Sequence, residues 1–569
     1  MIIEDILNEF KRTHLEHIED IVITDGYEGG KAVVEYFRGL LLTLKGTSSE
    51  AMSVSVKWDG APAVVCGTNP DNGKFFVGTK SVFAQNAKIN YTKRDIANNH
   101  GTDDLGQKLL KCLVHLKKLT IIGGGPAGYA AALYASNFEL EITLIESDTL
   151  GGTCLNRGCI PAKYWLHVAE LNHEIDNSMD FGIEITGKNI DWKATAQKRL
   201  DTVNKLVGGI GMLLKSKKVK VIEGWGTIKD SNKVIVKTTD GKEEEISTDF
   251  ILLATGSKPR EIPNINVDGE FVITSDTALS WEEPPKKVCV IGAGAIGCEF
   301  ASLLNDLGSE VTVVELDKEI LPGLDKRTSG ELRKQLSSRG VDFKLSTSVT
   351  NINDKVVNFS DDTSSSFDCV LVAVGRAPLT ENIGLEEIGV NVKKGFVEVD
   401  LKTMQTDVEN IYALGDIVYD TPQLAHVAFA EAISAITHIA TGEISPVNYN
   451  AIPYVVYTRP ELAEVGLNSE KAKEVGIKLN QAQHSFAGIG RALLQNQNKG
   501  IVKVYSKEDG PIVGASVCGP AAGEMIHELV YMVGWEALPS EAAEFIHAHP
   551  TLSEAIGESL LSLNGRGLH

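Results

Sequence analysis

The stretch GGTCLNRGCIPAK, from Gly151 to Lys163, decides the fold because it places two cysteines with four residues between them. A straight helix would separate Cys154 and Cys159 by about 7.5 Å along its axis, at about 1.5 Å per residue. A disulfide needs its Cα atoms within roughly 4.4–6.8 Å, so we predict a distorted turn that is softened at Gly158. Strained, accessible disulfides are the reducible ones. The pair therefore indicates a redox-active disulfide rather than two unrelated cysteines or a structural staple.

A nucleotide-binding pattern stands directly before the cysteine pair. A short buried strand is predicted at Lys118–Ile122, a helix at Tyr129–Ser136 and a second strand at Glu141–Ile145, which ends in Glu146. The acid lies 23 residues after the first glycine of the intervening turn. Such glycines allow close approach to a pyrophosphate at a helix N-terminus, and the acid binds ribose hydroxyls. The glycines of the turn are Gly123, Gly125 and Gly128.

The same pattern occurs a second time. A strand at Lys287–Ile291, a helix at Cys298–Leu307 and a strand at Glu310–Val314 lead to Glu315, again 23 residues after the first glycine. A lone glycine motif is weak, but the same ordered elements twice disfavour two ordinary tight turns. The glycines of the second turn are Gly292, Gly294 and Gly297.

The two copies are expected to bind different nucleotides. The first is followed at once by the cysteine pair, so its cofactor should exchange electrons with sulfur. Flavin fits, because it takes a hydride from nicotinamide and exchanges two electrons with a disulfide. We therefore assign FAD to the first copy and NAD to the second. Glu315 and Asp317 would repel a 2′-phosphate, and no arginine stands ready to bind it, which favours NAD over NADP.

Composition narrows the class of protein. The chain has 569 residues, enough for several domains, and a net charge of −21 without a long basic tract, which argues against a nucleic-acid partner. Its 8 cysteines are mostly scattered and do not suggest an extracellular disulfide framework. With no apolar run of about 18 residues and no signal-peptide core at the start, we expect no membrane association and a cytoplasmic location. No metal site is expected.

Together these motifs resemble the pyridine nucleotide–disulfide oxidoreductases, and within that family the dihydrolipoamide dehydrogenases, from about Lys117 onward. The resemblance implies an α/β protein with two Rossmann-type dinucleotide-binding domains and a C-terminal α+β dimerisation domain, here with an extra N-terminal α+β segment. Arg157 and Ala162 depart mildly from the usual pattern. The further matching motifs are ATG at Ala254–Gly256, VGRAP at Val374–Pro378, LGDI at Leu414–Ile417, YTRPELAEVG at Tyr457–Gly466 and HAHPTLSE at His547–Glu554.

The resemblance assigns roles around the cysteines. Cys159 would face the flavin as the charge-transfer thiol, and Cys154 would be the interchange thiol that meets lipoamide. Lys163 would lie near the flavin and pair with Glu299.

A histidine and a carboxylate complete the predicted catalytic set. A dithiol reductase needs a base near neutral pH, and His549 is of the right residue type. Glu554, five residues later, would fix its tautomer and steady the imidazolium. In the family this histidine serves the disulfide of the other subunit, so the resemblance makes a homodimer part of the active site. We assign no role to His547.

The resemblance also implies further cofactor contacts. Asp416 would bind the ribityl chain of the flavin, Thr255 and Gly256 would approach the flavin nucleotide, and Gly224 would offer its backbone to the adenosine end. The other expected cofactor-binding residues are Gly152, Thr153, Gly375 and Ala425.

The implied reaction is oxidation of dihydrolipoamide to lipoamide with NAD⁺, and the implied partner is the lipoyl domain of a 2-oxo acid dehydrogenase complex or a related lipoyl protein. Mercuric reductases and large thioredoxin reductases carry a C-terminal cysteine pair, whereas the last cysteine here is Cys518. Glutathione reductases usually bind NADPH through arginines that the second copy lacks. Another FAD-dependent disulfide reductase of the family remains the alternative.

Residues 1–116 do not fit the reductase pattern. The motif Lys57-x-Asp59-Gly60 resembles the nucleophile motif of covalent nucleotidyltransferases, and the surrounding KWDGAPA resembles phage proteins. Later motifs for metal-binding carboxylates and a second lysine are missing before residue 117, so an active ligase is not expected. A phage-related nucleotide-binding protein with a passenger reductase is the alternative from a different class.

We divide the chain into five parts. They are a nucleotidyltransferase-like segment (1–116), the first part of the FAD-binding domain (117–257), the NAD-binding domain (258–378), a central domain that completes the FAD site (379–448) and the interface domain (449–569). Within the last, Val502–Cys518 is predicted as alternating strands, followed by a helix at Glu524–Val533. A helical stretch at Leu105–Leu116 leads into the first reductase strand without a Gly/Pro/Ser linker.

Overall fold

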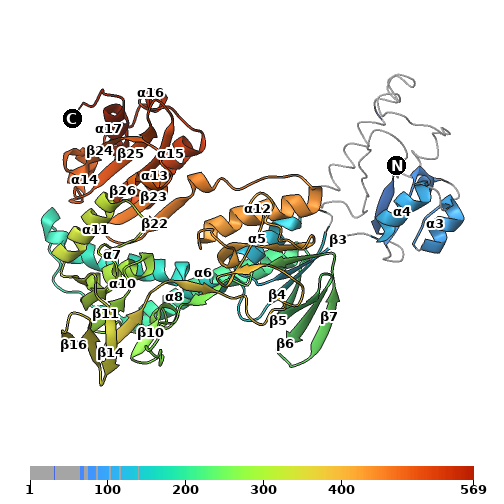
Figure 1. Cartoon of the computed structure of the whole chain (residues 1–569), viewed down its shortest axis with the longest axis horizontal. Helices are drawn as coiled ribbons and strands as arrows, with labels where there is room; N and C mark the ends of the chain where they lie inside the picture. Colours follow the sequence, from blue (N-terminus) through green and yellow to red (C-terminus); the bar gives the residue numbers. More distant parts are fainter. Residues whose placement is uncertain are drawn as a thin grey trace. The chain divides into compact units, whose positions relative to one another are not determined.

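The computed structural model describes Lys31 and residues 64–68, 75–84, 87–91, 93–101, 104–114, 117–138 and 140–568. The chain forms two compact units, Met1–Leu116 and Lys117–His569, and each is described by itself (Figure 1).

The first unit has a small core built from the side chains of Val77, Ile96 and Leu109. Lys57 and its motif lie outside the described residues. The helix expected before residue 117 is present as α4. The described elements are β1 (Val65–Thr68) and β2 (Phe75–Gly78), which pair antiparallel, the 3-10 helix η1 (Lys80–Phe83), α3 (Lys93–His100) and α4 (Asp104–Val114).

The second unit begins with a seven-stranded sheet in the order β21-β8-β3-β4-β5-β6-β7. Leu119, Ile121 and Ile122 are buried on β3, which lies between two parallel neighbours, as a continuous apolar strand should. Helix α5 (Pro126–Ala135) follows the glycine turn, and α12 (Ala425–Thr441) packs along it (Figure 1). The strands are β3 (Lys117–Ile122), β4 (Leu140–Glu146), β5 (Lys220–Asp230), β6 (Lys233–Thr238), β7 (Glu243–Ser247), β8 (Phe250–Leu253) and β21 (Ile411–Ala413).

The second predicted nucleotide fold is a five-stranded parallel sheet in the order β10-β17-β11-β12-β13. Two helices, α10 (Ala295–Asp306) and α11 (Lys326–Ser338), belong to this part of the chain. The strands are β10 (Val272–Thr274), β11 (Lys287–Ile291), β12 (Glu310–Val314), β13 (Asp342–Lys344) and β17 (Cys369–Val372).

The C-terminal part is an antiparallel sheet in the order β22-β23-β26-β25-β24. The helices α15 (Ala522–Gly534) and α17 (Glu554–Leu563) pack against it (Figure 1). The strands expected at Val502–Cys518 and the helix expected at Glu524–Val533 are confirmed. The expected alternation is wrong, because both strands are buried along almost their whole length. The strands are β22 (Pro453–Val456), β23 (Glu461–Gly466), β24 (Leu479–Ser485), β25 (Ile501–Lys507) and β26 (Ile512–Gly519).

The predicted fold class is therefore confirmed, since two doubly wound sheets precede an antiparallel C-terminal domain. Among the helices that the structure describes, none is long and apolar enough to cross a membrane.

Candidate active site

The cysteine pair lies at a break between two helices. Cys154 belongs to α6 (Gly152–Arg157), and Cys159 begins α7 (Cys159–Asp176). Gly158, with φ −145° and ψ −117°, interrupts the helical path between them. A Cβ atom at Gly158 would lie only 2.8 Å from the Thr153 carbonyl oxygen and 3.3 Å from Cys154 Cα. The predicted distortion is therefore found at Gly158, where the packing leaves no room for a side chain.

The two cysteines are free thiols in the structure. A hydrogen bond from the Cys154 thiol lowers the pKa of Cys159 to about 7, against the opposing effect of burial and with help from the Lys163 charge. The same hydrogen bond, together with burial, raises the pKa of Cys154. Cys159 thus ionises first while Cys154 keeps its proton. The disulfide stays a prediction for the oxidised state.

Lys163 stands one turn after Cys159 and is paired with Glu299. Its Nζ lies 3.0 Å from Glu299 Oε1 and 2.9 Å from Oε2. Glu299 is 7% exposed and belongs to α10 in the second nucleotide fold. Burial opposes the charge on the lysine, but Glu299 and Cys159 outweigh it, so the pKa of Lys163 lies above its ordinary value. The expected Lys163–Glu299 pair is therefore present and joins α7 to α10 of the second nucleotide fold.

The first and third glycines of the first turn leave no room for a side chain, whereas a Cβ atom at Gly125 would make only an ordinary contact of 3.8 Å with Gly152 Cα. A Cβ atom at Gly123 would lie 2.2 Å from the Ala254 carbonyl oxygen, and one at Gly128 would lie 1.8 Å from the Gly123 carbonyl oxygen. Glu146 accepts the Gly124 N–H at 2.6 Å, so its carboxylate lies beside the turn. These features suit a backbone cradle for a pyrophosphate with an acid for the ribose.

The helix that carries Cys154 begins against the same turn. A Cβ atom at Gly152, whose φ is +54°, would lie 2.7 Å from Gly125 Cα. The positive φ and this close approach both require glycine. The first nucleotide turn and the redox helix are thereby brought together.

The second glycine turn repeats the first. A Cβ atom at Gly292 would lie 2.6 Å from the Ala373 carbonyl oxygen, and one at Gly297 would lie 1.9 Å from the Gly292 carbonyl oxygen. Glu315 accepts the Ala293 N–H at 2.6 Å, as Glu146 does in the first copy. A Cβ atom at either Gly294 or Gly375 would meet no atom of the described structure within 4 Å.

A chain of hydrogen bonds joins Asp416 to α6, the helix that carries Cys154. Asp416 lies in the 3-10 helix η3 (Gly415–Ile417) and accepts a hydrogen bond from the Ser257 hydroxyl. Arg376 donates to that hydroxyl from Nε at 2.7 Å and reaches Thr153 Oγ1 from Nη2 at 3.4 Å. Sequence reasoning did not assign Ser257 or Arg376, although Arg376 stands in the VGRAP motif.

Other predicted cofactor contacts are placed as follows. Thr255 donates its hydroxyl to the Leu379 carbonyl at 2.6 Å, and Gly256 has a φ of +75° with open space at its Cβ position. Ala425 begins α12. A Cβ atom at Gly224 would lie 2.6 Å from the Lys237 carbonyl oxygen of β6, so strand packing already accounts for glycine there.

The predicted pair of the base His549 and its carboxylate partner Glu554 is formed in the C-terminal domain. His549 Nδ1 lies 2.8 Å from Glu554 Oε1, and the Thr551 N–H donates to Glu554 Oε2 at 2.9 Å. Burial works against the charged carboxylate, but these two hydrogen bonds outweigh it and hold the pKa of Glu554 below its ordinary value. The His549 side chain is 78% exposed, which leaves its other ring nitrogen accessible.

Within one chain, no contact among the described residues joins His549 to the cysteine pair. His547, which received no role, forms a second histidine–carboxylate pair, with Nε2 at 2.6 Å from Glu528 Oε1. Nothing in the sequence indicated this second pair beyond the presence of His547 two residues before His549. Its carboxylate, Glu528, lies on α15 and outside the HAHPTLSE motif.

Residues 117–432 match the pyridine nucleotide-disulphide oxidoreductase model, and residues 452–560 match the dimerisation domain of the same family. The chain belongs to the pyridine nucleotide-disulphide oxidoreductase family. Residues 8–124 match a family of unknown function.

Relatives of known name cover most of the second unit. The chain is 36% identical to a dihydrolipoyl dehydrogenase of Bacillus subtilis over 471 residues, 79% of this chain and 98% of that protein. It is 38% identical to a mitochondrial dihydrolipoyl dehydrogenase of Canis lupus familiaris over 461 residues, 78% of this chain and 90% of that protein. The crystal structure of LpdA from Mycobacterium tuberculosis superposes with a TM-score of 0.74 at 27% identity, covering 79% of this chain and 100% of that one.

Membership makes the protein an FAD- and NAD-dependent disulfide oxidoreductase, and its dimerisation domain makes it a homodimer. The two glycine turns fit both cofactors, because each brings bare backbone and one carboxylate to the end of a parallel strand pair. The resemblance of residues 1–116 to nucleotidyltransferases gains no support from a family of unknown function.

Proposed function

We propose that the protein is a dihydrolipoyl dehydrogenase, which oxidises dihydrolipoamide to lipoamide with NAD⁺. Relatives of that name align over nearly their whole length. The observation that carries the proposal is the cysteine pair at the break between α6 and α7, with the Lys163–Glu299 pair one turn beyond Cys159. In this setting the pKa of Cys159 is lowered and that of Cys154 is raised. A dithiol substrate needs one sulfur to attack and one to leave as a stabilised thiolate.

The cycle starts from the Cys154–Cys159 disulfide. His549 of the partner subunit takes the proton of one substrate thiol at Nε2, while Glu554 of the partner subunit holds Nδ1–H and steadies the imidazolium. The substrate sulfur attacks Cys154, and the bond between the two cysteines breaks. Cys159 leaves as a thiolate that Lys163 stabilises. The second substrate thiol then attacks the mixed disulfide, releasing lipoamide and leaving Cys154 as a thiol.

The residues that would hold the cofactors follow from the two turns. Glu146 and Asp416, with the backbone of the first turn, would hold FAD, and Glu315, with the backbone of the second turn, would hold NAD. When bound, this pair of cofactors supplies the two-electron acceptor chemistry that returns the reduced cysteines to the disulfide. Lys163 would keep a positive charge beside the thiolate throughout.

The partner, location and domain limits are further parts of the proposal. A lipoyl domain of a 2-oxo acid dehydrogenase complex, or a related lipoyl protein, would present the substrate, and the location would be cytoplasmic. The domain boundaries remain those given from the sequence. A mass increase on Lys57 after incubation with ATP would instead support the alternative of a nucleotide-binding protein in which residues 1–116 act and the reductase is a passenger.

Turnover of dihydrolipoamide with NAD⁺ by flavin-loaded protein tests the function, with glutathione and NADP⁺ run alongside. We expect rapid turnover with dihydrolipoamide and NAD⁺ only, and its loss in Cys154→Ser. Cys66→Ser, at a half-buried cysteine of the first unit, is the matched control and should retain activity. Preference for another disulfide, or activity that persists in Cys154→Ser, would contradict the proposal.

A further inference from the structure

The side chain of Tyr457 lies against the active-site lysine. Tyr457 directly follows β22 of the C-terminal domain, yet Lys163 Nζ is 4.3 Å from the centre of its ring. Its backbone N–H donates to Glu299 Oε1 at 3.0 Å. One residue of the dimerisation domain therefore contacts both members of the Lys163–Glu299 pair.

One face of α10 holds this tyrosine segment. Glu299, Ser302 and Asp306 are three and four residues apart, so they project from the same side of the helix. Glu299 binds the Tyr457 N–H at 3.0 Å, and Ser302 Oγ accepts the Arg459 N–H at 2.9 Å. Asp306 binds the Arg459 guanidinium, with Nε at 3.0 Å. We call these three contacts the α10 ladder.

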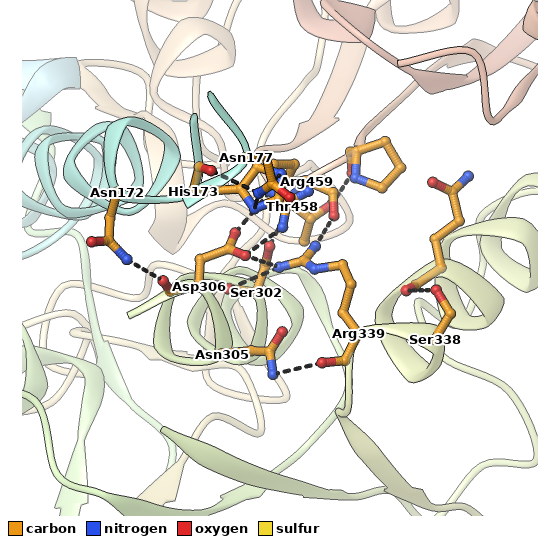
Figure 2. Close-up of polar contacts among 12 residues, drawn as sticks. Asn172, His173, Asn177, Ser302, Asn305, Asp306, Ser338, Arg339, Thr458 and Arg459 are labelled. Carbon is orange, nitrogen blue, oxygen red and sulfur yellow. Dashed lines mark hydrogen bonds and ion pairs between the residues drawn. The ribbon is translucent and has the colours of Figure 1, made fainter. Parts of the chain in front are cut away.

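The Asp306 contact of the α10 ladder is buried, and Asp306 forms ion pairs with two arginines. Figure 2 shows Asp306 between the guanidinium groups of Arg459 and Arg339. The Asp306 side chain is 6% exposed, and Arg339 Nη2 lies 2.6 Å from it. Arg339 also donates to the Arg459 carbonyl and, at 3.3 Å, to the Ser302 carbonyl. Because one buried carboxylate anchors two arginines, the segment that carries Tyr457 is fixed to α10.

Charged and titratable groups meet Cys159 from several elements. They are Tyr129 on α5, Cys154 on α6, Lys163 on α7, Glu299 on α10 and Tyr457 after β22.

Among these groups, Lys163 is the cation that favours the thiolate, and both Glu299 and Tyr457 contact its ammonium group. An aromatic ring attracts an ammonium group without adding a competing negative charge. The ring therefore holds the lysine without drawing its charge away from the sulfur.

We propose that Tyr457 is a positioning residue that keeps the Lys163 ammonium beside Cys159, and that the α10 ladder sets the place of its ring. This inference rests on the proposed role of Cys159 as the thiolate that is formed in turnover. It assigns the dimerisation domain a task within its own chain, separate from supplying His549 to the other subunit.

The test is the titration of Cys159 in flavin-loaded Cys154→Ser protein, in which Cys159 is the only thiol left in the redox pair. Alkylation by iodoacetamide is followed against pH by mass spectrometry of the peptide that contains Cys159. Adding Tyr457→Leu should raise the titration midpoint by roughly half a pH unit, the size expected for a partly exposed cation–π contact. Tyr457→Phe, which keeps the ring and removes only the hydroxyl, should leave the midpoint nearly unchanged.

An unchanged midpoint in Tyr457→Leu, or an equal shift in Tyr457→Phe, would overturn the proposal. If the leucine variant fails to retain flavin, Ser302→Ala decides, because it removes one contact of the α10 ladder without touching the ring. Ser302→Ala should shift the midpoint upward by a smaller amount, and the parent midpoint there would overturn the proposal. The assay uses no lipoyl substrate, so its failure is distinguishable from an error about the substrate.

Discussion

Replacing Gly158 with alanine is the sharpest test of the redox turn. The new Cβ would stand 2.8 Å from the Thr153 carbonyl oxygen, whereas ordinary contacts begin near 3.4 Å. The carbonyl must therefore withdraw by about 0.6 Å, and Cys154, the next residue, moves with it. In the dithiol state of the variant, the two helices are free to move apart, because the sulfurs are not bonded. In the disulfide state the bond holds the two helices together, so the strain remains.

The size of the effect follows from the cost of overpacking, which is typically about 1–3 kcal/mol. If that cost falls on the disulfide state, the equilibrium between disulfide and dithiol shifts by about 5- to 150-fold. For a two-electron couple this corresponds to a reduction potential higher by about 20–65 mV. Gly158→Ala should therefore be easier to reduce and slower to reoxidise.

Equilibration of the protein in thiol–disulfide buffers, followed by alkylation and mass analysis of the Cys154–Cys159 peptide, gives the potential. Gly187→Ala is the matched control, since its Cβ would meet no atom within 4 Å, and it should keep the parent potential. A folded Gly158→Ala protein with the parent potential would refute the reasoning, because the steric contact would then not bear on the bond.

Three further outcomes are expected. Glu554→Gln should lower turnover by roughly 10²-fold or more, measured with saturating dithiol, because the base loses its charged partner; nearly full turnover would contradict the dyad. Glu315→Gln should weaken the preference for NAD⁺ over NADP⁺ in kcat/KM by about tenfold; an unchanged preference would show that the carboxylate does not face the 2′-position. Lys503→Met leaves the buried Asp325 without its cation and should cost about 3–5 kcal/mol in urea unfolding; a loss under about 1 kcal/mol would count against this.

The pH dependence of stability gives the sign of the Asp325 contribution. Burial works against its charge, but hydrogen bonds from Tyr505 and Thr328 and the charge of Lys503 outweigh it, so the pKa of Asp325 is lower in the folded protein. Its stabilisation is therefore present above the pKa of an unfolded aspartate and is lost as pH falls through the folded value. Lys503→Met should flatten this acid-side decline.

The nucleotide turns were predictable because their chemistry is local. Gly123 and Gly292 are each followed five residues later by the glycine that packs on their carbonyl oxygen, Gly128 or Gly297. The acid stands at the end of the next strand. Close backbone approaches leave no other residue type possible at these positions. The distortion at Gly158 was predictable for the same reason, since helical rise and disulfide reach conflict within six residues.

The supporting contacts were not predictable from local pattern. Ser257 and Asp416, which share a hydrogen bond, are separated by 159 positions, and Tyr457 reaches Glu299 across 158. No periodicity spans such distances, because these pairs exist only after the sheets pack. Lys163 and Glu299 are equally remote in sequence, and their pairing was predicted only because the chain resembles a known family.

The site divides its chemistry between one chain and two. Lys163, Glu299 and Tyr457, to which we assign stabilisation of the thiolate, all belong to the chain that carries the cysteines. His549, the proposed base, makes no contact with those cysteines among the described residues of its own chain, so in the proposed mechanism proton transfer depends on the partner subunit. A dissociated subunit should therefore keep the low pKa of Cys159 and lose turnover with the dithiol. A dilution series tests this by following the titration of Cys159 and the turnover of the dithiol in the same samples. If dilution abolished both the low pKa of Cys159 and turnover, the thiolate chemistry would also depend on the subunit interface.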